Sequence, residues 1–298
     1  MKREGAGGGG SGLEWGAGSR RRLARSRVFE VVTLFAALFG VLVLAVILGD
    51  ILLDGARHLS GHFFTNYASR FPERAGIRAP LMGTLWLLGL TTLMAVPVSV
   101  GAAIYLEEYA PRNWATRAVR ANIANLAGVP SIVYGILGLA LFVRTLGLGG
   151  SLISGALTLS LLIMPIIILA AQEAIRAVPH GVREGAYALG ASRWQVVRHQ
   201  VLPLALPGIV SGAILAVSRA VGEAAPLIMI GAMSFIAFTP ESLSDPFTAL
   251  PMQVFHWVSR PQEEFKGLAA AAIVVLLVLV LSMNAAAFVI RSRSRLEG

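Results

Sequence analysis

Long apolar stretches separated by short polar segments dominate the chain. Uncharged runs cover 31–49, 79–106, 121–143, 145–172 and 268–290, and a further run over 200–240 is interrupted only by Arg219 and Glu223. A helix needs about 20 residues to cross about 30 Å of hydrocarbon, and these runs supply that length. We therefore predict an all-α, polytopic membrane protein with six spans, at about 28–53, 80–106, 119–143, 151–177, 204–235 and 267–290.

The composition agrees with this pattern. Of 298 residues, 56% are hydrophobic and 14% charged, with a mean hydropathy of +0.72, whereas a soluble domain needs more charge on its surface. The net charge of +9 would suit nucleic acid, but polytopic membrane proteins gather arginine in their cytoplasmic loops, so we expect no nucleic-acid partner. The chain has no cysteine, which excludes disulfides and thiolate metal sites.

The first 27 residues differ from the rest. Gly5–Gly18 is rich in glycine and is followed by RRRLARSR at 20–27. We expect residues 1–27 to form a disordered cytoplasmic segment. The uncharged run that follows is longer than the core of a signal peptide and lacks a clear cleavage site. We therefore predict a retained first span, a membrane domain over 28–290 and a cytoplasmic tail over 291–298.

Basic residues lie mostly on one side of the predicted spans. The N-terminal segment, the loop over 112–120, the loop between the fourth and fifth spans and the tail contain 17 of the 25 Lys and Arg residues, against seven in the opposite loops. Basic residues favour the cytoplasmic side of a membrane. We therefore predict that both termini and the loop 178–203 are cytoplasmic.

The loop 178–203 has a helical pattern of its own. Gly190 suits the left-handed residue that follows a helix C-terminus, and Ser192 with Gln195 suits a capping box, so we predict two short helices bent at Gly190. One apolar helical face contains five residues, namely Tyr187, Ala191, Trp194, Val197 and Val201. An amphipathic helix outside the bilayer either lies on lipid or occupies a groove of a partner, and periodicity alone does not choose between these alternatives.

Arg219 and Glu223 are the only charged residues of the predicted fifth span, and we expect them near its middle. A charge at that depth costs at least about 2.5–3.5 kcal/mol, so it should face a water-filled cavity or a partner. Four residues apart, the two share one helix face. Either they form an ion pair that fixes helix packing, or Arg219 offers its planar guanidinium to a passing oxyanion while Glu223 holds it when the path is empty.

Glycine and proline mark expected contacts between the spans. Gly128, Pro130 and Gly135 predict a kink and a tight contact in the third span. In the fifth span, close packing against other helices and local bending are predicted by Gly208, Gly212, Gly222 and Pro226.

The pattern Glu184-x-Ala186-x-x-x-Gly190, followed by Leu202-Pro203, resembles the EAA loop of ABC importer permeases. In that family the loop is the coupling helix that docks on a cytoplasmic ATPase, which favours the partner alternative. The residues that the resemblance implies for ATPase coupling are Glu184, Ala186, Gly190, Arg193 and Trp194. The chain departs from the family pattern at Gly185, where alanine is usual, and at Gln200, where the pattern has an aliphatic residue.

Longer segments resemble the PstA permeases of phosphate-specific ABC importers. They are VPSIVYGILGL at 129–139, AVPHGVREGAYALGASRW at 177–194, LPLALPGIVSGAILAVSRAVGEAAPL at 202–227 and PMQVFHWVSRPQEEF at 251–265. The ending GEAAPL is similar to PstA rather than to its sister permease PstC, although Ala224 stands where threonine is frequent. The resemblance covers most of the chain from about residue 80 onward.

This resemblance implies a type I ABC importer permease fold, also called MetI-like, in the bacterial inner membrane. It implies that Arg219 and Glu223 line the path of inorganic phosphate. The partners that it implies, besides membrane lipid, are a PstC-like sister permease, two PstB-like ATPase subunits and a PstS-like phosphate-binding protein.

The sequence lacks the motifs of an enzyme. It contains no GxxxxGK[ST] motif, and Lys2 and Lys266 are its only lysines, so ATP must be bound and hydrolysed by partner subunits. It contains no HExxH or GxSxG motif, and one buried acid is fewer than a proton- or sodium-driven transporter usually shows. We expect a non-enzymatic permease with no cofactor or metal of its own. A permease for another oxyanion and a non-transporting membrane scaffold or sensor component stay open as alternatives.

Overall fold

The computed structural model describes residues 17–233 and 235–294. Within these ranges the regular structure is helical, and the one pairing of extended residues is an isolated bridge between Ser151 and Pro246. The predicted all-α class is therefore confirmed. The chain divides into two compact units, Met1–Asp50 and Ile51–Gly298.

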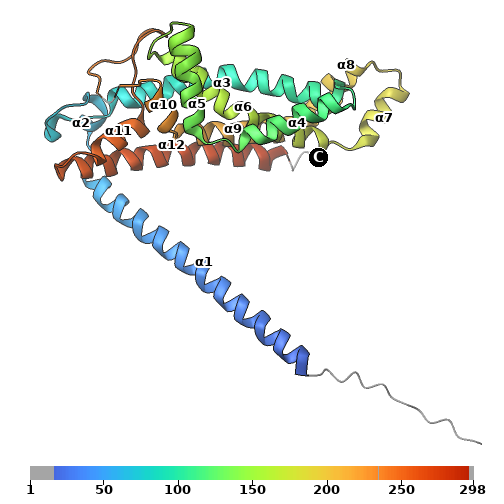
Figure 1. Cartoon of the computed structure of the whole chain (residues 1–298), viewed down its shortest axis with the longest axis horizontal. Helices are drawn as coiled ribbons and strands as arrows, with labels where there is room; N and C mark the ends of the chain where they lie inside the picture. Colours follow the sequence, from blue (N-terminus) through green and yellow to red (C-terminus); the bar gives the residue numbers. More distant parts are fainter. Residues whose placement is uncertain (1–16, 234, 295–298) are drawn as a thin grey trace, which may run out of the picture. The chain divides into compact units, whose positions relative to one another are not determined.

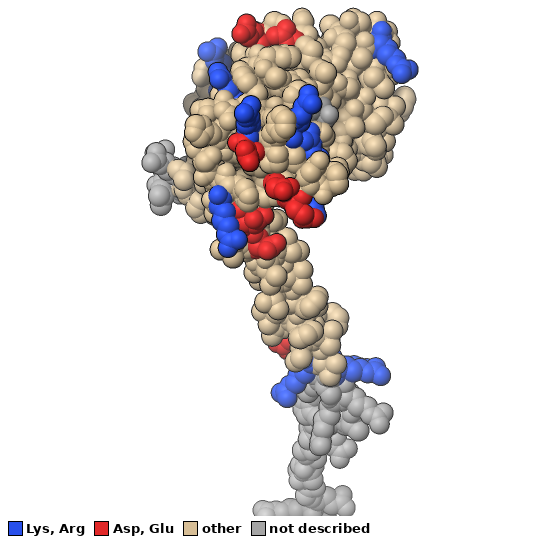
Figure 2. Space-filling model, turned by 90° about the vertical axis from the view of Figure 1, so that its left-hand side faces the viewer, with Lys and Arg blue, Asp and Glu red and all other residues tan. Residues whose placement is uncertain are grey.

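The described part of the first unit, residues 17–50, is helical throughout. α1 (Ala17–His58) begins inside the N-terminal segment and runs without a break into the second unit (Figure 1). The expectation of disorder is therefore wrong for residues 17–27, while residues 1–16 lie outside the described part. From Val28 to Ile47 its side chains are exposed, and Figure 2 shows an uncharged surface beyond the charged residues near its start. A helix that is apolar on all sides is typical of a membrane span.

The second unit contains the remaining elements (Figure 1). In chain order they are α2 (Gly61–Thr65), η1 (Pro72–Arg74), α3 (Arg78–Ile104), η2 (Tyr105–Tyr109), α4 (Trp114–Ala127), α5 (Ser131–Gly138), η3 (Leu139–Thr145), α6 (Leu152–Arg176), α7 (His180–Ala188), α8 (Arg193–Val196), η4 (Val197–Val201), α9 (Leu202–Val221), α10 (Ala225–Met229), α11 (Leu250–Val258) and α12 (Glu264–Ser294). The elements η2, η3 and η4 are π-helical turns, and η1 is a 3₁₀ turn.

Among the described residues, five helical segments are long and apolar enough to cross a membrane. They are Arg25–His58, Arg78–Tyr109, Leu152–Arg176, Arg193–Val221 and Glu264–Ile290. A sixth results if Trp114–Ala127 and Ser131–Thr145 are taken together, but these two helices are bent by 103°. The predicted third span, 119–143, is therefore not one straight helix. The kink expected at Gly128 and Pro130 is present, because proline offers no backbone N–H and disfavours a helical conformation in the residue before it.

The predicted fifth span, 204–235, is too long. α9 ends at Val221, where the backbone N–H of Gly222 donates to the Arg219 carbonyl at 3.2 Å, and the short helix α10 follows. Pro226 in the first turn of α10 cannot continue the helical ladder, because it has no N–H to donate. The predicted 291–298 tail is also helical as far as Ser294 in α12.

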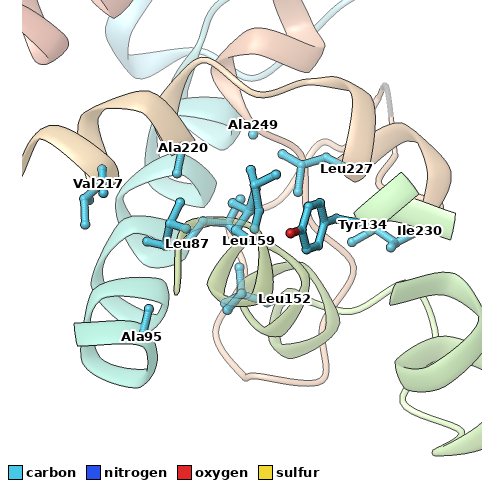
Figure 3. Packing of buried hydrophobic residues seen from close by; sticks show 14 of the residues in the cluster. Leu87, Ala95, Tyr134, Leu152, Leu159, Val217, Ala220, Leu227, Ile230 and Ala249 are labelled. Carbon is cyan, nitrogen blue, oxygen red and sulfur yellow. The ribbon is translucent and has the colours of Figure 1, made fainter. Parts of the chain in front are cut away.

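The largest buried cluster surrounds α6. Its side chains include Leu87 of α3, Tyr134 of α5, Leu159 of α6, Val217 of α9 and Leu227 of α10, which lie close together in Figure 3. Within a bilayer, close van der Waals packing of such side chains holds the helices together, because lipid is as apolar as the core. α9, the helix that contains Arg219, is therefore packed against α3 and α6 through this core.

Glycines permit the close approaches that the sequence predicted. A Cβ atom placed on Gly135 of α5 would lie 2.7 Å from the Pro226 Cα atom of α10. A Cβ atom on Gly208 of α9 would lie 2.8 Å from the Ala174 Cβ atom of α6. Any larger residue would push these helices apart, so both predicted contacts are confirmed.

Candidate functional site

The elbow, residues 178–203, joins α6 to α9. Gly190 follows α7 with φ at 82°, and its N–H donates to the Tyr187 carbonyl at 2.9 Å. A capping box opens α8: the Ser192 N–H donates to Gln195 Oε1 at 2.8 Å, and the Gln195 N–H donates to Ser192 Oγ at 3.4 Å. The predicted pair of short helices bent at Gly190 is therefore confirmed.

The predicted apolar face of the elbow is divided in two. Val197 and Val201 are fully buried together with Val196, and they anchor the second half of the elbow in the core. Tyr187 and Trp194 are instead exposed. The prediction of one continuous face is wrong because it assumed one regular helix, whereas the bend at Gly190 and the π-helical turn η4 change the direction of successive side chains.

The residues predicted to couple to an ATPase lie on the accessible side of the elbow. Glu184 is exposed and makes no ion pair with a described residue, while Ala186 is half-buried against the core. Gly190 and Trp194 are exposed, and the Arg193 guanidinium lies 5.1 Å from the centre of the Tyr109 ring. These five residues therefore differ in their surroundings, and Arg193 alone among them lines the polar cavity described below.

Two adjacent glutamates at the end of α3 bind three arginines. Glu107 accepts hydrogen bonds from Arg120 of α4 and, at 2.7 Å, from Nη2 of Arg176 at the end of α6. Glu108 accepts from Nε and Nη2 of Arg183 in α7, at 3.2 and 2.9 Å. The side chains of Glu108 and Arg183 are only 10% and 14% exposed. The end of α3 therefore contacts α4, α6 and the elbow through charged hydrogen bonds.

Arg183 also binds the C-terminal end of α6. Its Nη1 donates to the Val178 carbonyl at 2.6 Å, and its Nη2 donates to the Ile175 carbonyl at 2.8 Å. The last carbonyls of a helix have no partner within the helix, so an arginine at this point satisfies them and neutralises the negative end of the helix dipole. One side chain of the elbow is thus bonded to the ends of two long helices.

A polar cavity of about 510 Å³ lies beside these ion pairs. Its lining includes Glu107 and Glu108 together with the four arginines Arg112, Arg176, Arg183 and Arg193. Sequence reasoning missed the two glutamates, because Arg176 and Arg183 follow their partners by 69 and 75 residues. The sequence signal that could have identified them is a pair of adjacent glutamates at the end of an apolar run, on the arginine-rich side of the predicted spans.

Arg219 and Glu223 form the ion pair expected from their spacing, with 3.7 Å between Nε and Oε1. The prediction that they lie near the middle of a helix is wrong, since Arg219 is in the last turn of α9 and Glu223 lies beyond it. The Arg219 side chain is 57% exposed, whereas that of Glu223 is 19% exposed. The guanidinium is thus accessible from outside the chain and only loosely paired.

Solved structures share the fold of this chain. A chain of a bacterial alginate ABC transporter matches with a TM-score of 0.64 at 17% identity, covering 91% of this chain and 97% of that chain. A chain of the MetNI methionine ABC transporter matches with a TM-score of 0.58 at 20% identity, covering 71% of this chain and 94% of that chain. The fold is therefore that of an ABC importer permease, as predicted.

Sequence comparison gives the family. Residues 95–296 match the model described as "Binding-protein-dependent transport system inner membrane component", and the chain belongs to this family. It is 35% identical over 249 residues to the probable ABC transporter permease protein YqgI of Bacillus subtilis, covering 80% of this chain and 85% of that protein. It is 33% identical over 234 residues to the phosphate transport system permease protein PstA 1 of Mycobacterium tuberculosis, covering 78% and 76%. It is also 32% identical over 249 residues to the permease protein PstC of Haemophilus influenzae, covering 74% and 78%.

These matches confirm the resemblance to the PstA permeases and a membrane-embedded permease as the general function. They also agree with the expectation of a transport subunit that is not itself an enzyme. The roles of individual residues rest on the geometry described above.

Proposed function

We propose that this chain is the PstA-like permease subunit of an ATP-driven phosphate importer and lines the translocation path for inorganic phosphate. Family membership and the similarity to permeases named for phosphate transport support the transport class. The observation that carries the substrate assignment is the accessible Arg219 guanidinium at the end of an otherwise apolar helix.

Arg219 has the chemistry that an oxyanion requires. A guanidinium is charged at any physiological pH and presents five N–H donors in a planar fork that matches the oxygens of phosphate. Its contact with Glu223, at 3.7 Å, is longer than a hydrogen bond and leaves those donors unsatisfied. Phosphate would displace this weak contact, and Glu223 would hold Arg219 again after the anion leaves.

The elbow provides the surface that would bind an ATPase subunit. Tyr187, Leu189 and Trp194 are exposed, Leu189 to 90%, and Glu184 is free to pair with a basic residue of a partner. Large apolar side chains exposed on one short segment favour a protein interaction site there. In the proposed complex the elbow binds one of two PstB-like ATPase subunits, which bind and hydrolyse ATP because this chain has no motif for it.

The complex also needs a second permease and a source of phosphate. We infer a PstC-like sister permease that completes the path around Arg219, and a PstS-like binding protein that delivers phosphate on the side opposite the elbow. With the elbow and both termini in the cytoplasm, ATP-driven closure of the ATPase pair would move the elbows and open the path outward. Release of the nucleotide would return Arg219 to the inward-open state.

The test is ATP-dependent uptake of labelled phosphate by the purified complex in proteoliposomes. Arg219→Gln should lower uptake by about 10- to 100-fold, since a hydrogen bond to a charged group contributes about 1.5–3 kcal/mol. Arg144→Gln, which removes one exposed charge outside α9, is the matched control and should transport normally. Normal uptake by the Arg219→Gln complex, with assembly unchanged, would exclude the role of this residue.

The same assay separates the alternatives. A permease for another oxyanion would show uptake of phosphate that sulfate or arsenate competes away at low concentration. A scaffold or sensor component would assemble with its partners but show no uptake that depends on ATP.

A further inference from the structure

α7, the first helix of the elbow, is attached to the rest of the chain in an unusual way. None of its described residues is fully buried, and half-buried Ala186 provides an apolar contact with the core. The Arg183 side chain is the exception to this exposure: it extends away from the surface and is only 14% exposed. The charged hydrogen bonds that attach α7 to the long helices therefore come from Arg183, beside the apolar contact of Ala186.

That side chain makes four hydrogen bonds at once. Two go to Glu108 at the end of α3, and one each goes to the Val178 and Ile175 carbonyls at the end of α6. A guanidinium is planar, so several simultaneous bonds fix its orientation as well as its position. α7, α3 and α6 are thus joined at a single rigid point, which we call the elbow joint (Glu108 and Arg183).

The neighbouring glutamate provides a contrast. Glu107 belongs to the same π-helical turn, η2, yet it binds Arg120 of α4 and Arg176 of α6 and makes no described bond to α7. The two carboxylates are adjacent in sequence but bind different elements, because successive helical side chains point in different directions. Glu107 is therefore a matched internal control for Glu108.

Beyond the elbow joint, the two long helices are hydrogen-bonded to each other, and α9, which carries Arg219, packs on α6. Thr91 Oγ1 of α3 donates to the Ala156 carbonyl of α6 at 3.4 Å, and Ser99 Oγ donates to the Met164 carbonyl at 3.3 Å. α9 packs on α6 at Gly208, whose Cα is close to Ala174. A movement applied at Arg183 thus has a continuous packed route to α9.

We propose that Glu108 and Arg183 are positioning residues that transmit the movement of the elbow to α3 and α6. Without them, the ATPase subunits would hydrolyse ATP while little phosphate is transported. This inference rests on the proposed function, in which an ATPase moves the elbow. A weaker joint lets α7 follow the ATPase while α3 and α6 stay behind. The ratio of phosphate imported to ATP hydrolysed would then fall, although the ATPase still binds the exposed face of the elbow.

The first experiment measures that ratio in proteoliposomes for Glu108→Gln, Arg183→Gln and the control Glu107→Gln. We expect a loss on the order of tenfold for the first two, no further loss when they are combined, and a change of less than about twofold for the control. A wild-type ratio in Glu108→Gln, or an equal loss in Glu107→Gln, would overturn the proposal. Should these variants fail to assemble, Arg183→Lys keeps the charge but lacks the fork, and a wild-type ratio in that variant would also overturn it.

A second experiment does not depend on phosphate. Because the chain has no cysteine, spin labels can be placed at Pro111→Cys, beside the end of η2, and at Gly181→Cys on α7, where both residues are exposed. The distance between the labels should stay narrow with and without ATP in the wild-type complex and broaden in Glu108→Gln. An unchanged distribution in that variant would refute the elbow joint. A wild-type complex that imports no phosphate would instead refute the proposed function, and the label distances would still test the joint.

Discussion

The bend at Gly190 allows a sharp test of how the elbow is built. Gly190 has φ at 82°, and no described atom lies within 4 Å of the position of an added Cβ. Gly190→Ala therefore meets no steric clash with a neighbour, and its whole cost is backbone strain. A left-handed conformation costs a non-glycine residue about 1–2 kcal/mol, and 1.4 kcal/mol corresponds to about tenfold in an equilibrium.

A matched substitution five residues earlier should act in the opposite direction. Gly185 lies inside α7, has no positive φ, and likewise has no described atom within 4 Å of an added Cβ. Alanine there removes conformational freedom from the unfolded segment and should stabilise α7 by about 0.5–1 kcal/mol. The same glycine-to-alanine substitution is thus expected to have opposite effects on the stability of the elbow at these two positions.

Hydrogen exchange of the amides in the last turn of α7 measures this local stability. The reporters are the N–H groups of Leu189 and Ala191, which donate to the Gly185 and Ala186 carbonyls at 3.2 and 3.1 Å. We expect about tenfold faster exchange in Gly190→Ala and about two- to fivefold slower exchange in Gly185→Ala. Exchange in Gly190→Ala at the wild-type rate, or faster exchange in Gly185→Ala, would refute the assignment of strain to the bend.

Two other predictions concern stability in detergent. Gly135→Leu should destabilise the fold by about 1–3 kcal/mol because its side chain would collide with Pro226. Gly89→Leu is the control, since an added Cβ there meets no described atom within 4 Å, and it should melt at the wild-type temperature. A wild-type melting temperature for Gly135→Leu would exclude the close contact. Burial, and secondarily the charge of Arg260, lower the pKa of His256 below its ordinary value of 6.5, so the unfolded chain binds a proton more readily than the folded one. Stability should therefore fall as the pH drops below about 6.5, and thermal melting at pH 7.5 and 5.5 should show a smaller difference in His256→Gln than in the wild type.

Local signals account for what the sequence predicted well. Uncharged runs identify membrane-crossing helices because hydrocarbon sets a minimum length, and this requires no knowledge of tertiary contacts. The bend of the elbow could be predicted equally well, because the left-handed residue at Gly190 and the capping box at Ser192 are determined by neighbours within four residues. In both cases the controlling physics acts over a short distance along the chain.

The missed features depend on residues far apart in sequence. Glu108 and Arg183 are 75 residues apart, and no sequence pattern around either residue identifies the other as its partner. The size of the bend between α4 and α5 was beyond a sequence argument for a similar reason, because α5 is packed against α10 at Gly135. Arg219 was misplaced because apolar composition continues past Val221, although the helix does not.

The self-contained character of α1 has a consequence for biogenesis. α1 is one continuous helix, so its backbone groups bond within it, and its apolar side chains from Val28 to Ile47 are exposed. Lipid can therefore cover these side chains without any other helix. Such a helix can partition into the bilayer as soon as it leaves the ribosome, before α3 has been synthesised. The arginines at 20–27 resist crossing, so this early insertion would fix the direction in which every later helix is threaded.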